Sequence, residues 1–262
     1  MAVKNMLGHT LDLLGVAIVS GRFEPGASLP PEAMLCSELG VSRTVVREAV
    51  KSLVAKGLLS TGPKVGTRVL DSDQWNWFDP QVVGWISKNG LSHDYLRDLQ
   101  ELRRVVEPAA ARLAAERATA QDLAELEDAF AGMKKAIEYG GDYVTHDLRF
   151  HQGLLKASHN RMVIQMAKAL GVLLRTSFEI STAKPNGPAS SLAMHRAVLD
   201  AVIAHQPDKA ERANLKLIDG ASDDIESVLA TRRKLPSVAS PALPLRAPRG
   251  ASRGARKGSV TV

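Results

Sequence analysis

Residues 31–57 read PEAMLCSELGVSRTVVREAVKSLVAKG, and this segment carries the strongest structural signal in the chain. Pro31 suits the first turn of a helix, and Gly40 suits the tight turn that follows it. Ser42 is a good N-cap for a second helix, which we expect to end near Gly57. Two short helices joined by a glycine-containing turn make a helix-turn-helix. Apolar residues that would lock the pair recur at helical spacing, at Leu35, Leu39, Val41, Val46, Ala49, Val50 and Leu53.

The second of these helices has a basic face. Arg43, Arg47 and Lys51 are four residues apart, so they share the side opposite the apolar stripe. A helix N-terminus with aligned cations fits the phosphate-lined major groove of DNA. Three cations alone also describe a solvated basic face, so the flanking sequence has to decide between the two interpretations.

A β-hairpin is predicted directly after the helix-turn-helix. Residues 58–60 and 67–69 have strand character, and the sequence GPKVG, residues 62–66, forms a turn between them. A hairpin in this place is a wing, which would bring Lys64 and Gly66 against the DNA backbone. Together these elements predict sequence-specific DNA binding, with contacts from Ser42, Arg43, Thr44, Arg47, Lys64 and Gly66.

A connector separates this head from the rest of the chain. Residues 5–70 form the DNA-binding domain, which begins with a helix near 5–21. Residues 71–90 contain all three tryptophans, and we expect this connector to pack one domain against the other. The tryptophans are Trp75, Trp77 and Trp85.

Residues 91–231 show helical apolar spacing and no strand signal. The fold class is therefore mainly α: a winged helix-turn-helix of three helices and a hairpin, joined to an all-α helical bundle. Residues 232–262 are rich in Pro, Ala, Ser, Gly and Arg and are predicted to be a disordered basic tail. The expected bundle helices lie near 93–116, 119–139, 142–157, 160–179, 190–205 and 207–231, with a loop at 183–188.

The amino-acid composition indicates the class of protein and its cellular compartment. The 262 residues are 45% hydrophobic, yet no apolar run approaches the ~20 residues of a membrane span. No secretion signal is apparent, and the single Cys36 excludes an intrachain disulfide, so we expect a cytoplasmic protein. The net charge of +6 comes from the two ends of the chain. Residues 1–70 have eight basic and five acidic residues, and residues 236–262 have five basic residues and no acid, which suits a nucleic-acid-binding head.

The head and the connector together resemble a known family. Residues 20–69, SGRFEPGASLPPEAMLCSELGVSRTVVREAVKSLVAKGLLSTGPKVGTRV, resemble the winged helix-turn-helix of the GntR superfamily. The helical part resembles the effector domain, called FCD, of its FadR-type branch. The segments QWNWFDPQVVGWI and ELRRVVEPAAARLAAERAT are most similar to the repressors of galactonate catabolism within that branch. The resemblance implies a homodimer on a palindromic operator that responds to a small carboxylate, here a galactonate-like aldonate.

The helical part also contains a candidate effector site. In the 142–157 helix, Asp147 and His151 fall inside the apolar stripe, and in the 190–205 helix His195 does the same. An inward carboxylate is costly unless it is paired or coordinated. Two imidazoles and a carboxylate are a common metal-ligand set. The alternative is that each histidine is an ordinary hydrogen-bonded core residue.

The resemblance bears on the same residues. FCD domains that bind a divalent metal use one Asp and three His; Asp147, His151 and His195 match three of these, and Leu217 occupies the fourth place. The site is then either an open three-ligand metal site, for zinc or a similar ion, or a pocket without a metal.

Two further residues complete the predicted effector site. Arg103 lies at the inner border of the 93–116 helix, where it would clamp a carboxylate. The alternative for Arg103 is a snorkelling arginine in an interface salt bridge. Asn214 lies on an inward face and would bond a ligand hydroxyl.

The sequence therefore predicts a ligand-responsive transcription regulator, a repressor of sugar-acid catabolism and not an enzyme. Effector binding would shift helices, act through the tryptophan connector and change the spacing of the two DNA-binding heads. A metal-dependent enzyme acting on an organic acid is the main alternative, but it leaves the winged head unexplained. The second alternative is an architectural DNA-binding protein that has no ligand. The inward-facing Asp147, His151 and His195 argue against this alternative.

Overall fold

The computed structural model describes residues 3–63, 65–89 and 92–231. It confirms the predicted fold class, because the described chain is helical apart from one two-stranded antiparallel sheet. The chain forms two compact units, which meet along the sequence between Asn76 and Trp77. Lys64 and residues 232–262 lie outside the described residues, so the DNA contact of Lys64 and the disorder of the tail stay predictions.

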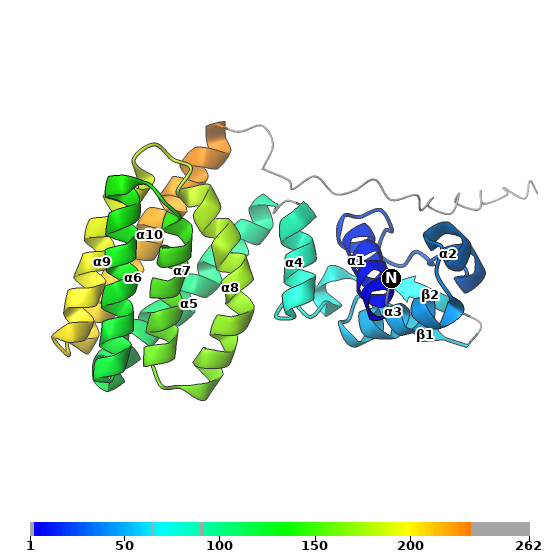
Figure 1. The fold of residues 1–262 in the computed structure, drawn as a ribbon, viewed down its shortest axis with the longest axis horizontal. Coiled ribbons are helices and arrows are strands. Elements are labelled where there is room, and N and C mark those ends of the chain that lie inside the picture. The colour runs from blue at the N-terminus through cyan, green and yellow to red at the C-terminus, as the bar shows by residue number, and fades with distance from the viewer. Residues whose placement is uncertain (1–2, 64, 90–91, 232–262) are drawn as a thin grey trace, which may run out of the picture. The chain divides into compact units, whose positions relative to one another are not determined.

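The first unit contains the predicted helix-turn-helix and hairpin (Figure 1). Gly40 ends the second helix in the left-handed conformation (φ +65°), and its N–H donates to the carbonyl oxygen of Cys36. Ser42 caps the third helix, because its Oγ accepts a hydrogen bond of 3.4 Å from the Val45 N–H. The turn and the cap are thus confirmed. The elements are α1 (Val3–Val19), α2 (Glu32–Leu39), α3 (Arg43–Ala55), β1 (Leu59–Gly62), β2 (Gly66–Val69) and the 3-10 helix η1 (Ser72–Gln74).

The hairpin lies beside α3 (Figure 1). Its strands pair antiparallel from Leu59 opposite Val69 to Gly62 opposite Gly66, so β1 extends two residues beyond the predicted strand. Gly57 has φ +75°, and a Cβ there would lie 2.3 Å from the Gln74 carbonyl oxygen. Only glycine therefore lets the end of α3 meet the segment after the hairpin.

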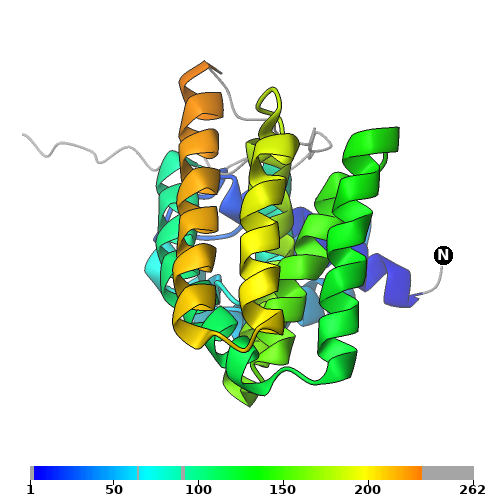
Figure 2. The same cartoon turned by 90° about the vertical axis from the view of Figure 1, so that its left-hand side faces the viewer.

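The second unit is a bundle of long helices that run side by side (Figure 2). The six predicted bundle helices agree with the observed ones to within three residues at each end. The predicted loop at 183–188 is too long, because Asn186 reverses the chain with φ +61° and Pro188 fits the first turn of the next helix. The helices are α4 (Pro80–Asn89), α5 (His93–Arg117), α6 (Ala120–Tyr139), α7 (Tyr143–Ala157), α8 (Arg161–Ser181), α9 (Gly187–Ile203) and α10 (Pro207–Thr231).

The tryptophan connector is divided between the two units. In the first unit, Trp75 Nε1 donates to the Leu70 carbonyl oxygen at 3.1 Å. In the second unit, Trp85 is buried on α4, which packs against α8, and Trp77 lies against Tyr95 of α5 with ring centroids 5.4 Å apart. The predicted packing of one domain on the other through this segment stays a prediction.

The core of the bundle is formed by small and aliphatic side chains of five helices, α5, α6, α7, α9 and α10. Alanines of α5 allow close helix contact, and Phe150 of α7 is completely buried. Among the described helices, none combines the length and the apolarity needed to cross a membrane. Fully buried members of this core include Ala111, Ala114, Ala115, Leu126, Met133, Phe150, Val198, Leu199 and Val202.

Candidate DNA-reading face and effector site

The start of α3 presents the predicted DNA-contacting side chains to solvent. Ser42, Arg43 and Thr44 are exposed at its N-terminus, where the backbone N–H groups of a helix are free to bind anions. Arg47 follows on the same face with 61% of its side chain exposed. Gly66 is exposed at the start of β2 with φ +75°.

Two of the basic residues of α3 are paired with acids. The Nε of Arg47 donates to both carboxylate oxygens of Glu32 at 3.0 Å, and the Nζ of Lys51 donates to Glu48 at 2.8 Å. The ion pair with Glu32 raises the pKa of Arg47. Glu32 begins α2 and was not anticipated from the sequence, although it stands beside the proline that starts this helix. A groove lined by Glu32, Arg47 and Lys51 faces the wing residues Gly62 and Gly66.

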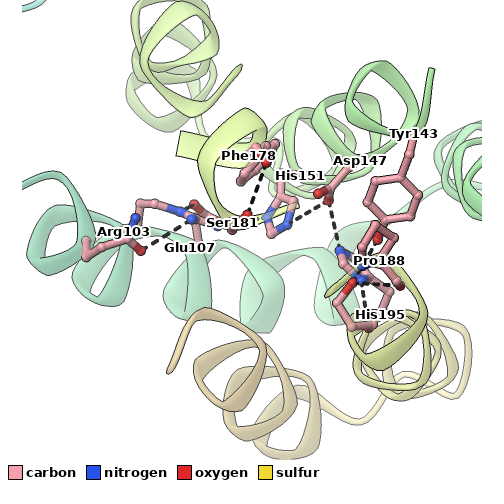
Figure 3. A network of polar contacts seen from close by, with 11 residues as sticks. Arg103, Glu107, Tyr143, Asp147, His151, Phe178, Ser181, Pro188 and His195 are labelled. Atoms are coloured by element: carbon pink, nitrogen blue, oxygen red, sulfur yellow. Dashed lines mark hydrogen bonds and ion pairs between the residues drawn. The ribbon is translucent and has the colours of Figure 1, made fainter. Parts of the chain in front are cut away.

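In the second unit, α7 and α9 bring the predicted effector residues together (Figure 3). Asp147, His151 and His195 are at most 5% exposed. The Oδ1 of Asp147 lies 3.0 Å from the Nε2 of His195 and 3.4 Å from the Nε2 of His151. One donor atom from each residue lies within 4.8 Å of the others. The predicted convergence of these three residues is therefore found in the structure.

The second ring nitrogen of each histidine is held by an oxygen. The Nδ1 of His195 lies 2.9 Å from the Ser191 carbonyl oxygen, and the Nδ1 of His151 lies 2.5 Å from the Oε2 of Glu107. Carbonyl and carboxylate oxygens only accept, so each Nδ1 carries a hydrogen. The two Nε2 atoms are thereby directed at Asp147. Partners of this kind orient metal-binding histidines in many proteins.

Glu107 also holds Arg103, in a buried ion pair on α5. The Nε of Arg103 donates to the Oε1 of Glu107 at 2.7 Å, and the two side chains are 1% and 2% exposed. The guanidinium lies 4.9 Å over the ring of Phe178, and its Nη1 donates to Gln100. Arg103 is therefore inside the bundle, deeper than the predicted border position, and it does not snorkel to the surface.

Glu107 is a site residue that the sequence interpretation missed. It follows Arg103 by four residues, so the two share one face of α5. An acid in that place, beside Val106 and Ala110 of the apolar stripe, is the signal that could have found it.

The pKa values reflect this pairing. Burial alone would raise the pKa of Glu107, but Arg103 and His151 outweigh it and lower that pKa to about 2. Burial would also raise the pKa of Asp147, yet His195 and His151 hold it well below its ordinary value. Burial would lower the pKa of His151, but Glu107 and Asp147 raise it to about 9. All three shifts favour the charged form of the group.

A small cavity lies against this network. Its free volume is about 20 Å³, which is room for one water molecule or one ion. Leu217, in the place of the expected fourth metal ligand, is 2% exposed and forms part of the wall. The lining residues are Arg103, Asp147, His151, Phe178, Ser181, Thr182, Gly187, Ser191, His195, Leu217, Ala221 and Asp224.

Asn214 is the predicted effector residue that the structure does not bring to this cavity. It is completely buried on α10, and neither atom of its amide has a hydrogen-bond partner within the described part of the chain. It precedes Leu217 by less than one helical turn, so it lies on the same side of α10. In this structure it does not line the cavity.

A groove-reading head and a sensing bundle with a buried polar site define a ligand-responsive, DNA-binding transcription regulator. Residues 9–69 match the model of bacterial regulatory proteins of the gntR family. Residues 98–220 match the FCD domain. The chain therefore belongs to the GntR family, in the group that has an FCD domain, and it is a regulator and not an enzyme.

Relatives support this assignment over most of the chain. The galactonate operon transcriptional repressor of Escherichia coli K12 is 36% identical, over 82% of this chain and 94% of that protein. An uncharacterized HTH-type transcriptional regulator, YieP, of the same organism is 32% identical, over 81% of this chain and 92% of that protein. A solved structure of Lar, described as controlling the Listeria monocytogenes agr system, has the same fold. Its TM-score is 0.60 at 19% identity, covering 84% of this chain and 96% of that one.

Proposed function

We propose that this chain is a cytoplasmic, homodimeric repressor that leaves its operator when a sugar acid enters the bundle. Residues 5–70 would be the DNA-binding domain, 71–90 the connector and 91–231 the sensing domain. The observation that carries the proposal is the buried polar network of Arg103, Glu107, His151, Asp147 and His195 beside a cavity. The name of the E. coli relative supports an aldonate such as galactonate as the effector.

On the DNA side, we assign phosphate and base contacts to the exposed start of α3 and to the wing. Arg47 is held by Glu32 at the surface, and such exposed ion pairs contribute little stability. DNA phosphates can therefore displace Glu32 without a large cost, and the released counterions favour binding. The proposed contacts are Ser42, Arg43, Thr44, Arg47, Lys64 and Gly66.

On the effector side, Arg103 is the proposed partner of the carboxylate. Arg103 lines the cavity, and its hydrogen bonds to Glu107 and Gln100 hold the guanidinium over the ring of Phe178. A fixed, planar guanidinium suits a carboxylate that accepts two parallel hydrogen bonds. Asp147, His151 and His195 would complete this site. Asn214 remains a proposed second contact, because its buried amide lacks a partner within the described residues.

A divalent metal, zinc or a similar ion, fits the same residues. Asp147, His151 and His195 offer a carboxylate oxygen and two Nε2 atoms within 4.8 Å of one another, and the Nδ1 contacts already orient both rings. Leu217 supplies no donor, so one coordination position stays open for water or for the effector. A bound metal would supply a positive charge that attracts the carboxylate.

The cavity volume implies two states of the sensing domain. About 20 Å³ cannot hold a six-carbon acid, so the walls have to move when one binds. A ligand that binds the state with the enlarged cavity more tightly than the closed state shifts the population toward the enlarged one. A coupling of about 1–3 kcal/mol between this site and the operator would make a useful switch.

The decisive experiment is operator binding measured with and without a sugar acid. A labelled fragment of the regulator's own promoter region is titrated with protein, and fluorescence anisotropy is followed as galactonate is added. Galactonate is expected to weaken operator binding about 5- to 150-fold. Galactose, which has the hydroxyls and lacks the carboxylate, is expected to have no effect. A response to neither compound, or an equal response to both, would contradict the proposal.

A further inference from the structure

The cavity beside the polar network has two chemically different ends. On α10, Leu217, Ala221 and Asp224 line it at successive turns, and the seven helical steps from the first to the last span about 10 Å. On α9, Gly187, Ser191 and His195 line it at successive turns. The two helices run in opposite directions, because a short turn joins them and Gly220 faces Met194.

One end is formed by Arg103 and by the cluster of Asp147, His151 and His195. Phe178 of α8 lies against the guanidinium and against His151. The other end is formed where α8 passes into α9, between Thr182 and Gly187, and it faces Asp224. A six-carbon chain whose carboxylate lies at Arg103 would therefore extend toward Asp224.

The side chains between the two ends mostly accept hydrogen bonds. Ser181 and Thr182 both donate their hydroxyl hydrogens to the Phe178 carbonyl oxygen, at 3.2 and 2.6 Å. Ser191 donates to the Pro188 carbonyl oxygen at 3.1 Å, and the Tyr143 hydroxyl lies 2.8 Å from the Ser191 Oγ. With these hydrogens bonded to carbonyl oxygens, the three hydroxyl oxygens keep lone pairs that can accept. Hydroxyl groups of a ligand can donate to them.

Asp224 adds a charged acceptor at the far end. Its side chain is 14% exposed, and its Oδ1 accepts from the Nζ of Lys184, in the turn between α8 and α9. Lys184 is 40% exposed, so it stands on the outer side of Asp224 and holds the carboxylate in the wall. A ligand carboxylate beside Asp224 would meet a like charge, which the single ion pair with Lys184 offsets only in part. A ligand hydroxyl there would find an acceptor.

We propose that Asp224 selects a hydroxyl over a second carboxylate at the far end of the effector. This inference rests on the proposed function and deepens it, because it names the effector class as a polyhydroxylated monocarboxylate. Lys184 acts as a positioning residue that holds Asp224. Like charges placed together are a strong means of excluding a wrong partner.

Galactonate and galactarate test this directly, because they share one carbon skeleton and differ only at C6. Isothermal titration calorimetry of the full-length protein is expected to give at least about tenfold tighter binding of galactonate. In Asp224→Asn, the affinity for galactarate should rise at least about tenfold, because the negative charge is gone and the amide N–H can donate to the second carboxylate. The affinity for galactonate should change less than about threefold, since the amide oxygen still accepts a hydrogen bond from its C6 hydroxyl.

Two further variants sharpen the result. Asp223→Asn removes the same charge from the neighbouring, exposed position on α10, so it should leave the ratio of the two affinities unchanged. Lys184→Met removes the counter-charge of Asp224, so galactarate should be rejected more strongly than by the wild type. This variant tests the inference even where Asp224→Asn does not fold.

The outcomes separate the two proposals. Equal affinity for both acids, or a ratio that Asp224→Asn leaves unchanged, overturns the role of Asp224 while the sensor function stands. Stronger galactarate binding by Lys184→Met also overturns it. Binding of neither acid overturns both.

Discussion

Glu107 is the residue on which the buried site depends. Its two carboxylate oxygens are divided between the guanidinium of Arg103 and the Nδ1 of His151, so one side chain orients both the proposed anion-binding group and a proposed metal ligand. All three side chains are at most 2% exposed. Removing any one of them leaves a charge without its partner in a low-dielectric interior, and this decides what single substitutions will do.

We predict that Arg103→Ala lowers the free energy of unfolding by about 3–5 kcal/mol. The substitution leaves the carboxylate of Glu107 buried without the guanidinium that now pairs with it. Urea denaturation followed by circular dichroism measures this. Arg104→Ala is the matched control, since Arg104 is the next residue and its side chain is 48% exposed in a pair with Asp219. If both variants are equally stable, the Arg103–Glu107 pair does not have the structural role described above.

A second residue-scale prediction concerns Glu107→Gln. The amide is a weaker hydrogen-bond partner for His151 Nδ1, so the ring is held less firmly. Loss of such an outer partner typically weakens metal binding about 10- to 100-fold. Competition for zinc with a chromogenic chelator measures this. Glu101→Gln, on the exposed side of the same helix, should bind zinc like the wild type, and equal zinc affinity in both variants would argue against the metal site.

At the scale of elements, the helix-turn-helix depends on how α2 ends. Gly40 has φ +65°, a conformation that a side chain disfavours, and open space surrounds the position of its missing Cβ. The requirement for glycine is therefore conformational and not a matter of packing. It sets the direction in which α3 leaves the turn and hence where Arg43 and Arg47 are presented.

Gly40→Ala is predicted to destabilise the first unit by about 1 kcal/mol through backbone strain. Gly8→Ala, inside α1 of the same unit, also meets no atom within 4 Å, but its φ is not positive. This control should be neutral or slightly stabilising, because alanine favours helix. Thermal unfolding of the two variants measures the difference. The same melting temperature for both would show that the turn tolerates a side chain.

At the scale of the whole molecule, the proposed function requires that the effector site and the operator site are coupled through the protein. Linkage makes this coupling reciprocal: if galactonate weakens operator binding by some factor, the operator weakens galactonate binding by the same factor. The buried polar contacts connect α5, α7, α8 and α9, since Gln100 also donates to Ser177 of α8 at 2.9 Å. A movement at the cavity would therefore involve α8, against which α4 packs.

This reciprocity can be measured. Calorimetric titration of galactonate into the protein alone and into the protein–operator complex should give dissociation constants that differ by about 5- to 150-fold. The factor should equal the loss of operator affinity seen by fluorescence anisotropy. A duplex of the same length with a scrambled operator sequence should leave galactonate affinity unchanged. Equal galactonate affinity with and without the operator would mean that the two sites are independent.

The local features of this protein could be predicted from its amino-acid sequence. The helix bounds, the Gly40 turn, the Ser42 cap and the inward faces of Asp147, His151 and His195 were predicted, because helical periodicity and capping act over a few residues. The start of α9 was placed three residues too late, since the left-handed Asn186 has no strong sequence signal.

Which of these side chains meet depends on how the helices pack. The contacts of Glu107 with His151 and of Lys184 with Asp224 join residues more than thirty positions apart. Such contacts depend on the rotation and offset of packed helices, and periodicity within one helix does not specify either. The same packing left Asn214 outside the cavity and closed the cavity to about 20 Å³.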